Sequence, residues 1–85
     1  MDDEQIAAHF EKHPQLSGLT EVYKSYTATF TRKNGQHIDV VIQILQSPEG
    51  TWTVQVWSED GKLAASNPNS YLEVALATVH WEKLE

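Results

Sequence analysis

The sequence predicts an α+β fold, a four-stranded antiparallel meander with an N-terminal and a C-terminal helix on one of its faces, in the order α-β-β-β-β-α. Three observations support this fold class. Apolar and polar residues alternate with a period of two between residues 21 and 65, three turns of one design interrupt the alternation, and apolar residues at both ends follow helical spacing. The 85 residues, of which 40% are hydrophobic, suffice for one core, so we expect a single domain over residues 1–85.

The N-terminal residues DEQIAAHFEKH predict a short helix. Acidic residues at its start suit the positive end of a helix, and Ile6 and Phe10 lie four residues apart on one side. His13 precedes a proline, a position at which helical geometry is disfavoured, so we expect the helix to end there. Residues 15–19 are then expected to form a loop whose two leucines reach the core.

The two long segments between residues 21 and 46 predict a hairpin, because both carry their apolar residues at even positions. Directly opposed residues of an antiparallel pair share a face, so the length of the loop decides whether the two even sets meet. A two-residue Asn34-Gly35 loop would place Phe30 opposite Asp39. A three-residue loop from Lys33, with Gly35 in the left-handed conformation, avoids this mismatch. The predicted pairs are then Phe30 with Ile38, Ala28 with Val40 and Tyr26 with Ile42.

The same turn design recurs at residues 48–50 and 59–61, each of which ends in glycine. These turns add a third strand and a short fourth strand. The additional predicted pairs are Ile44 with Val54, Ile42 with Val56, and Val56 with Ala64. The predicted core face of the sheet carries Val22, Tyr26, Ala28, Phe30, Ile38, Val40, Ile42, Ile44, Trp52, Val54 and Val56.

The C-terminal helix is predicted from a capping box and an apolar stripe. Ser70 and Glu73 have the spacing of the capping box. The stripe, which we expect to dock on the core face, consists of Leu72, Ala75, Leu76 and Val79. Three further apolar residues lie away from the stripe, and we expect the first helix to cover them: Tyr71, Val74 and Trp81. Leu84-Glu85 could begin a purification tag and are given no weight.

The composition narrows the classes of function. The net charge is −6, and the only basic spot is formed by Lys24, Arg32 and Lys33, so polyanions should be repelled. The chain has no cysteine, which excludes disulfides and thiolate chemistry. No apolar run approaches 18 residues and no charged-then-apolar leader opens the chain. We therefore expect an acidic, soluble, cytoplasmic protein that does not associate with a membrane.

The order helix, antiparallel meander, helix resembles the double-stranded-RNA-binding domain with an added fourth strand. The resemblance covers the topology of the whole chain but no motif. That family contacts RNA through a lysine cluster at the start of its second helix, where this chain has the uncharged residues 67–71. Arg32, Lys33 and Lys24 are the remaining candidates for nucleic-acid binding, and a nucleic-acid-binding adaptor is the alternative function.

Two groups of polar residues are candidates for a metal site or an acid–base catalytic site. His9 and His13 lie four apart and could face one metal ion, but no pattern supplies further ligands, so we expect no metal and no cofactor. His37, Asp39 and Glu59 come together in the predicted register and could perform acid–base chemistry if buried. They are expected at an exposed end of the sheet, as solvated charges. No Ser-His-Asp, P-loop or dinucleotide pattern is present, so we expect no enzyme.

The odd-numbered face of the sheet is unusually apolar. In the predicted register Thr27, Val41, Trp57 and Leu63 form one row, and Tyr23 and Leu45 lie in a neighbouring row. A solvated sheet face normally carries polar residues, and tryptophan is enriched at interface hot spots. We therefore predict a non-catalytic protein-interaction module whose partner is another protein or a second copy of the chain. The predicted contact residues are Trp57, Val41, Leu63, Tyr23 and Leu45.

Overall fold

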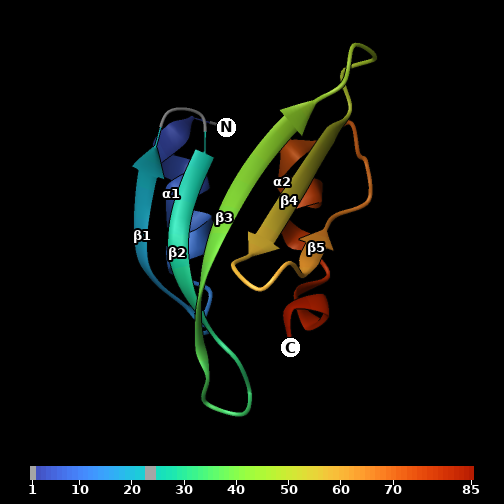
Figure 1. Ribbon diagram of the computed structural model, residues 1–85. Coiled ribbons are helices and arrows are strands. Elements are labelled where there is room, and N and C mark those ends of the chain that lie inside the picture. The colour runs from blue at the N-terminus through green and yellow to red at the C-terminus, as the bar shows by residue number, and fades with distance from the viewer. Residues whose placement is uncertain (1, 23–24) are drawn as a thin grey trace.

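The computed structural model describes residues 2–22 and 25–85 and shows an α+β fold built on one antiparallel sheet (Figure 1). The elements in chain order are α1 (Asp3–Glu11), β1 (Leu16–Val22), β2 (Ser25–Thr31), β3 (His37–Gln46), β4 (Trp52–Ser58), β5 (Leu63–Ala65), α2 (Leu72–Ala77) and the 3-10 helix η1 (Trp81–Leu84). The five strands lie side by side in the order of the sequence. Both α-helices lie behind the sheet in Figure 1 and pack on one face. We call this face the inner face and the opposite one the outer face.

The predicted registers of the three hairpins are confirmed. Phe30 pairs with Ile38, Ile44 pairs with Val54, and the other predicted pairs follow in step. The last residues of the three turns have positive φ angles, 90° at Gly35, 86° at Gly50 and 90° at Gly61. The positions of the apolar residues predicted the registers because each three-residue loop supplies its own left-handed glycine.

The sheet has five strands rather than four, because the loop predicted at residues 15–19 is wrong. Residues 16–19 belong to β1, and Val22 pairs with Ser25, so the segment expected to be a single first strand is divided between β1 and β2. A β-bulge hid the strand. Ser17 pairs with Thr29 but Thr20 pairs with Thr27, so two residues of β1 stand opposite Ala28. The bulge contains Gly18, with φ of 63°, and it shifts the alternation of the strand by one residue.

The bulge explains which β1 side chains reach the core. Leu16 and Leu19 are three residues apart, yet both pack against the core. Val22 was predicted on the core face and instead is 52% exposed, because it pairs with Ser25 and therefore shares the outer face with it. Tyr23 and Lys24, which carried predictions of protein and nucleic-acid contact, lie outside the described residues.

The core lies between the inner face and the helices. Ile6 and Phe10 of α1 belong to the same buried cluster as the inner-face residues of β2, β3 and β4. The predicted stripe of the C-terminal segment is buried in this cluster as well, from Leu72 to Val79. Leu84, which was expected to carry no weight as a possible tag residue, is completely buried and belongs to the core.

The first helix begins with acidic residues as predicted, whereas the second helix begins differently from the prediction. A capping box is present at α1, where Asp2 Oδ1 accepts a hydrogen bond from Gln5 N at 2.9 Å and Gln5 Oε1 accepts one from Asp2 N at 3.1 Å. The capping box predicted at the second helix is wrong, since Tyr71 is the N-cap of α2 and makes no side-chain cap. Asn69 explains the difference. Its backbone is bonded to that of Trp52, and its Oδ1 accepts from Tyr71 N at 2.9 Å, which keeps the chain non-helical through Tyr71.

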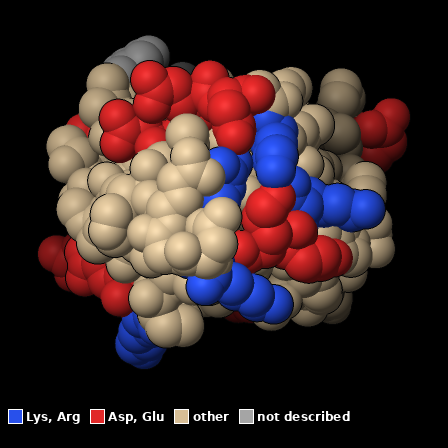
Figure 2. Space-filling model, turned by 60° about the horizontal axis from the view of Figure 1, so that its bottom comes forward, with Lys and Arg blue, Asp and Glu red and all other residues tan. Residues whose placement is uncertain are grey.

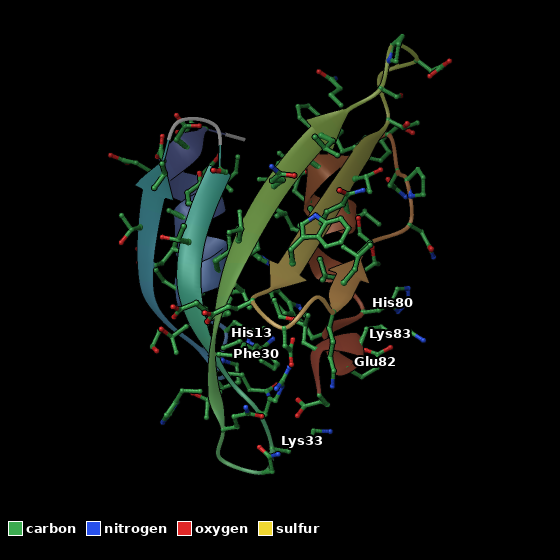
Figure 3. All side chains as sticks on the ribbon, in the orientation of Figure 1. His13, Phe30, Lys33, His80, Glu82 and Lys83 are labelled. Carbon is green, nitrogen blue, oxygen red and sulfur yellow. The ribbon has the colours of Figure 1, made fainter. Side chains whose placement is uncertain are left out.

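Of the three apolar residues that helix one was expected to cover, it covers only Trp81. The Trp81 ring lies 6.5 Å from that of Phe10 and 4.5 Å from that of His13, and it stacks on Phe30 at 6.1 Å. Figure 3 labels His13 and Phe30, whose rings both lie beside that of Trp81. Tyr71 and Val74 remain 69% and 41% exposed. The prediction therefore holds for Trp81 alone, which belongs to a separate helix because α2 ends at Ala77.

Candidate protein-binding face

The outer face gathers most of the large apolar side chains that remain exposed in the described residues. Seven such side chains are exposed, and five of them lie on the outer face. These five are Val22 at 52%, Val41 at 39%, Leu45 at 45%, Trp57 at 43% and Leu63 at 38%. We call them the outer patch. The helices leave this face uncovered because they pack on the inner one.

Strand pairing places these residues together. Thr20, Thr27, Val41, Trp57 and Leu63 form one row that crosses all five strands. This row contains the one predicted from the sequence, extended by β1. The pairing of Val22 with Ser25 adds an apolar residue to the next row, and sequence reasoning missed it. The detectable signal is in the sequence, where apolar Tyr23 at an odd position and charged Lys24 at an even one interrupt the alternation.

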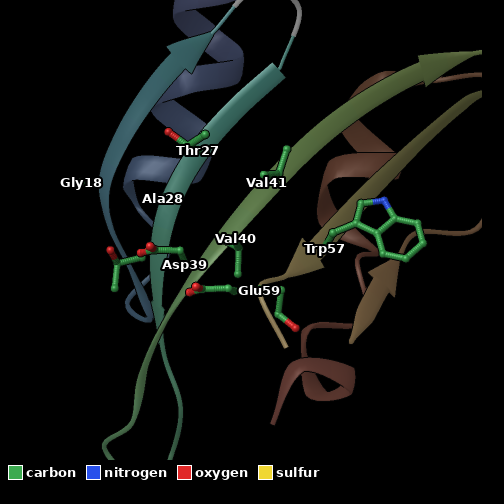
Figure 4. A pocket seen from close by; sticks show the side chains of 10 residues that line it. Gly18, Thr27, Ala28, Asp39, Val40, Val41, Trp57 and Glu59 are labelled. Atoms are coloured by element: carbon green, nitrogen blue, oxygen red, sulfur yellow. The ribbon is translucent and has the colours of Figure 1, made fainter. Parts of the chain in front are cut away.

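A groove of about 460 Å3 runs over the outer face beside this row (Figure 4). Thr27, Val41 and Trp57 line its apolar part, and Asp39 and Glu59 line one end. Figure 4 shows the two acidic side chains close together, whereas the Trp57 indole extends from β4 away from them. The backbones of these acidic residues are joined, since Glu59 N donates to Asp39 O at 2.9 Å. The groove therefore combines an aromatic wall with a negatively charged end.

The charge at this end is unbalanced within the described residues. Asp39 and Glu59 are exposed, and the salt bridges found in residues 2–22 and 25–85 include neither of them. None of the five strands contains a lysine or an arginine. His37, the third member of the group considered for acid–base chemistry, is exposed and bonded through Nδ1 to the Thr31 hydroxyl at 2.9 Å. These groups can attract a cation to the groove.

Arg32, a candidate phosphate contact, is instead a buried structural residue. Its side chain is 6% exposed, and its guanidinium donates from Nε to Leu84 O at 2.7 Å, from Nη1 to Gln36 Oε1 at 2.7 Å and from Nη2 to Asp60 Oδ2 at 2.6 Å. The hydrogen bonds from the Ser58 hydroxyl and from Arg32 Nη2 lower the pKa of Asp60 to about 2. Because of these bonds, Arg32 is not available as a free basic group. Among the described residues predicted to bind nucleic acid, Lys33 is exposed.

Glu85 also makes several hydrogen bonds at the end of the molecule that contains Arg32. Its Oε1 accepts from Lys33 N and its Oε2 from Gln15 Nε2, both at 2.8 Å, which lowers the pKa of the Glu85 carboxyl. Lys62 donates to the Glu85 carbonyl. Figure 2, which brings this end forward, shows basic groups lying among acidic ones rather than as a separate basic field. This mixture is unlike the continuous basic stripe of a nucleic-acid-binding surface.

The two histidines considered as metal ligands make other contacts. His9 Nε2 is bonded to Leu76 O at 3.2 Å, and His13 Nδ1 accepts from Gln15 N at 3.2 Å. Burial, and then the proximity of His9, lower the pKa of His13. Within residues 2–22 and 25–85 no group of three or more His, Asp or Glu side chains could hold a metal ion. In the same residues no helix has the length and apolarity needed to cross a membrane.

Neither a family model, nor a curated protein, nor a solved structure matches this chain. The resemblance to the double-stranded-RNA-binding domain therefore stays a prediction.

Proposed function

We propose that the protein is a non-catalytic protein-interaction module that docks a partner on its outer face. The observation that carries the proposal is the outer patch, which puts five exposed apolar side chains on one face with Trp57 in a row between Val41 and Leu63. A contiguous exposed apolar patch on a small protein is often functional. Tryptophan supplies a large contact area and is enriched at hot spots of binding energy.

The partner we favour is a different protein that presents a lysine or arginine beside apolar side chains. Asp39 and Glu59 lie at one end of the groove that Trp57 also lines. A cation at that end would meet two carboxylates, and the apolar side chains beside it would lie against Trp57 and Val41. A second copy packed face to face would bring no lysine or arginine from its strands. The homodimer is therefore the competing outcome of the test.

The expected contribution of Trp57 has the size of a hot spot. Covering the exposed part of a tryptophan removes about 100 Å2 from water, roughly half of what such a side chain can bury. At about 25 cal/mol per Å2 this area is worth about 2.5 kcal/mol. Hot-spot residues contribute about 2 kcal/mol or more, so loss of Trp57 should abolish a weak interaction.

The test uses a defined probe and a matched control. A peptide that alternates lysine with valine is titrated into the labelled protein, and chemical shifts are followed. We expect the Trp57 indole N–H and the Val41 and Leu63 methyl groups to shift, whereas a peptide with glutamate in place of lysine should shift none of them. Trp57→Ser should remove the response. Val74→Ser is the control, since Val74 is exposed to a similar degree but lies on α2.

Two measurements decide between the alternatives. Light scattering that shows a dimer, converted to a monomer by Trp57→Ser, would replace the basic partner with a second copy of the chain. Duplex RNA should not bind at physiological salt, because the net charge of −6 leaves little counterion release to drive association. RNA affinity that falls steeply with salt would instead favour the nucleic-acid-binding alternative. Equal responses to the lysine and glutamate peptides would contradict the proposed partner chemistry.

A further inference from the structure

A second cavity, of about 310 Å3, opens on the inner face between α1, α2 and the sheet. Tyr26, Ile44 and Trp52 come to it from three adjacent strands. Ile6 of α1 and Leu72 of α2 line it from the helices. The cavity is therefore mostly apolar and aromatic, and its volume lies at the lower end of the range for ligand pockets, about 300–1,000 Å3. It can hold a small molecule.

Tyr26 brings a hydroxyl without a protein partner to this cavity. Its side chain is only 5% exposed, yet its hydroxyl has no hydrogen-bond partner among residues 2–22 and 25–85. In that part of the chain no fully enclosed side-chain nitrogen or oxygen lacks a partner, so the hydroxyl is accessible from outside the protein. Since Tyr26 lines the cavity, a molecule that enters it can exchange a hydrogen bond with this hydroxyl.

Two carboxylates lie at the same cavity. Asp3 of α1 and Glu21 of β1 line it, and both are exposed to solvent. Burial raises the pKa of Tyr26, and the negative charges of Glu21 and then Asp3 raise it further. The salt bridges of the described residues include neither carboxylate. One polar corner of an apolar cavity thus presents three acceptors and a net negative charge.

We propose that this cavity binds a small organic amine with an apolar body. The ammonium lies among Asp3, Glu21 and the Tyr26 hydroxyl, since its three N–H donors match these three acceptors. The apolar body lies against Trp52, and Ile6 and Leu72 enclose it from the helices. The ring faces of Tyr26 and Trp52 also favour a cation nearby. This site is separate from the outer patch and does not depend on the proposed function.

The test compares two molecules of equal shape, 2-phenylethylamine and the uncharged 2-phenylethanol. We expect the amine to shift the Trp52 indole N–H and the Ile44 and Leu72 methyl groups in a saturable manner. The alcohol should bind at least about tenfold more weakly, because it lacks the charge-assisted hydrogen bonds. Shifts confined to Trp57 and Val41, or equal affinity for the two molecules, would overturn the proposal.

Substitutions test which polar residues of the cavity bind the ammonium group. Glu21→Gln should weaken amine binding about tenfold. Glu4→Gln, which removes a neighbouring charge of α1 that does not line the cavity, should change it less than about twofold. Tyr26→Phe keeps the ring and removes only the hydroxyl, so it should weaken binding while leaving the melting temperature unchanged or higher. Trp57→Ser should bind the amine normally whatever it does to the outer face. Unaltered affinity in Glu21→Gln and Tyr26→Phe would contradict the site.

Discussion

Val40 and Val41 are neighbours in β3 with the same side chain, and they belong to two different surfaces. Val40 faces the helices and is 2% exposed, whereas Val41 faces outward and is 39% exposed. The same contrast holds across the sheet, where inner-face Phe30 is completely buried and outer-face Trp57 is 43% exposed. The contrast indicates that the inner face stabilises the fold, while the outer face retains apolar area that the fold does not use.

The largest expected effect is on the inner face. Phe30→Ala removes a fully buried ring that stacks on Trp81, and it should lower the free energy of unfolding by about 3–5 kcal/mol. Urea denaturation followed by circular dichroism measures the change. A loss below about 1 kcal/mol would show that the inner face is less tightly packed than described.

The second largest effect is expected for Arg32→Met, which tests whether the hydrogen bonds of Arg32 stabilise the fold as the inner face does. Methionine keeps much of the apolar stem but leaves Leu84 O without its donor and Asp60 without its cation. Losing the partner of a buried group costs about 1–3 kcal/mol, which the same denaturation experiment measures. Lys33→Met is the control, because Lys33 is exposed, and it should change stability little.

The most direct test of the comparison is the pair Val40→Thr and Val41→Thr. Both changes keep the shape of the side chain and add a hydroxyl. Val40→Thr buries that hydroxyl in an apolar core and should cost about 1–3 kcal/mol, whereas Val41→Thr should stay within about 0.5 kcal/mol. Similar costs at the two positions would remove the distinction between the faces.

A smaller effect is expected in the turns, which belong to neither face. Gly35→Ala should destabilise by about 1–2 kcal/mol, because a residue with a Cβ is strained at a φ of 90°. An added Cβ meets no atom within 4 Å there, so the cost arises from the backbone alone. Gly35→Asn should recover part of it, since asparagine tolerates the left-handed conformation.

The smallest changes should come from pH, and their sign follows from two groups. The folded state lowers the pKa of His13 below its ordinary 6.5, so the unfolded chain binds the proton first and stability falls as pH drops below about 6.5. Asp60 has a pKa of about 2 in the fold against an ordinary 3.8, so its stabilisation is lost as pH falls from about 4 to 2. Thermal unfolding across this range should show both declines, and His13→Gln should remove only the first.

The sequence allowed the registers to be predicted because their determinants are local. Each turn carries its own glycine, and the parity of residues such as Phe30 and Ile38 then fixes the pairing. β1 escaped prediction because the bulge at Gly18 interrupts the period of two. Val22 was missed as a member of the outer patch for another reason, since it was assigned to the same strand as Ser25, with which it pairs.

Features that depend on distant parts of the chain were beyond sequence reasoning. The burial of Arg32 depends on a carbonyl 52 residues away, at Leu84. The capping box expected at Ser70 is absent because Asn69 is tied to Trp52. The row from Thr27 to Leu63 was predictable from register alone, whereas the inner cavity needs the positions of both helices, which no local pattern supplies.

The strands pair with their neighbours in sequence, whereas the C-terminal segment contacts residues far away in sequence, and this difference predicts an order of folding. Every strand pairs only with its neighbours in sequence, so the sheet can form through contacts of low contact order, which favours rapid folding. The bond from Arg32 to Leu84 and the stacking of Phe30 on Trp81 join segments about fifty residues apart and must wait for the C-terminal segment to dock. That segment should also be the first to open in the native state, so its amide protons should exchange with solvent sooner than those of β3.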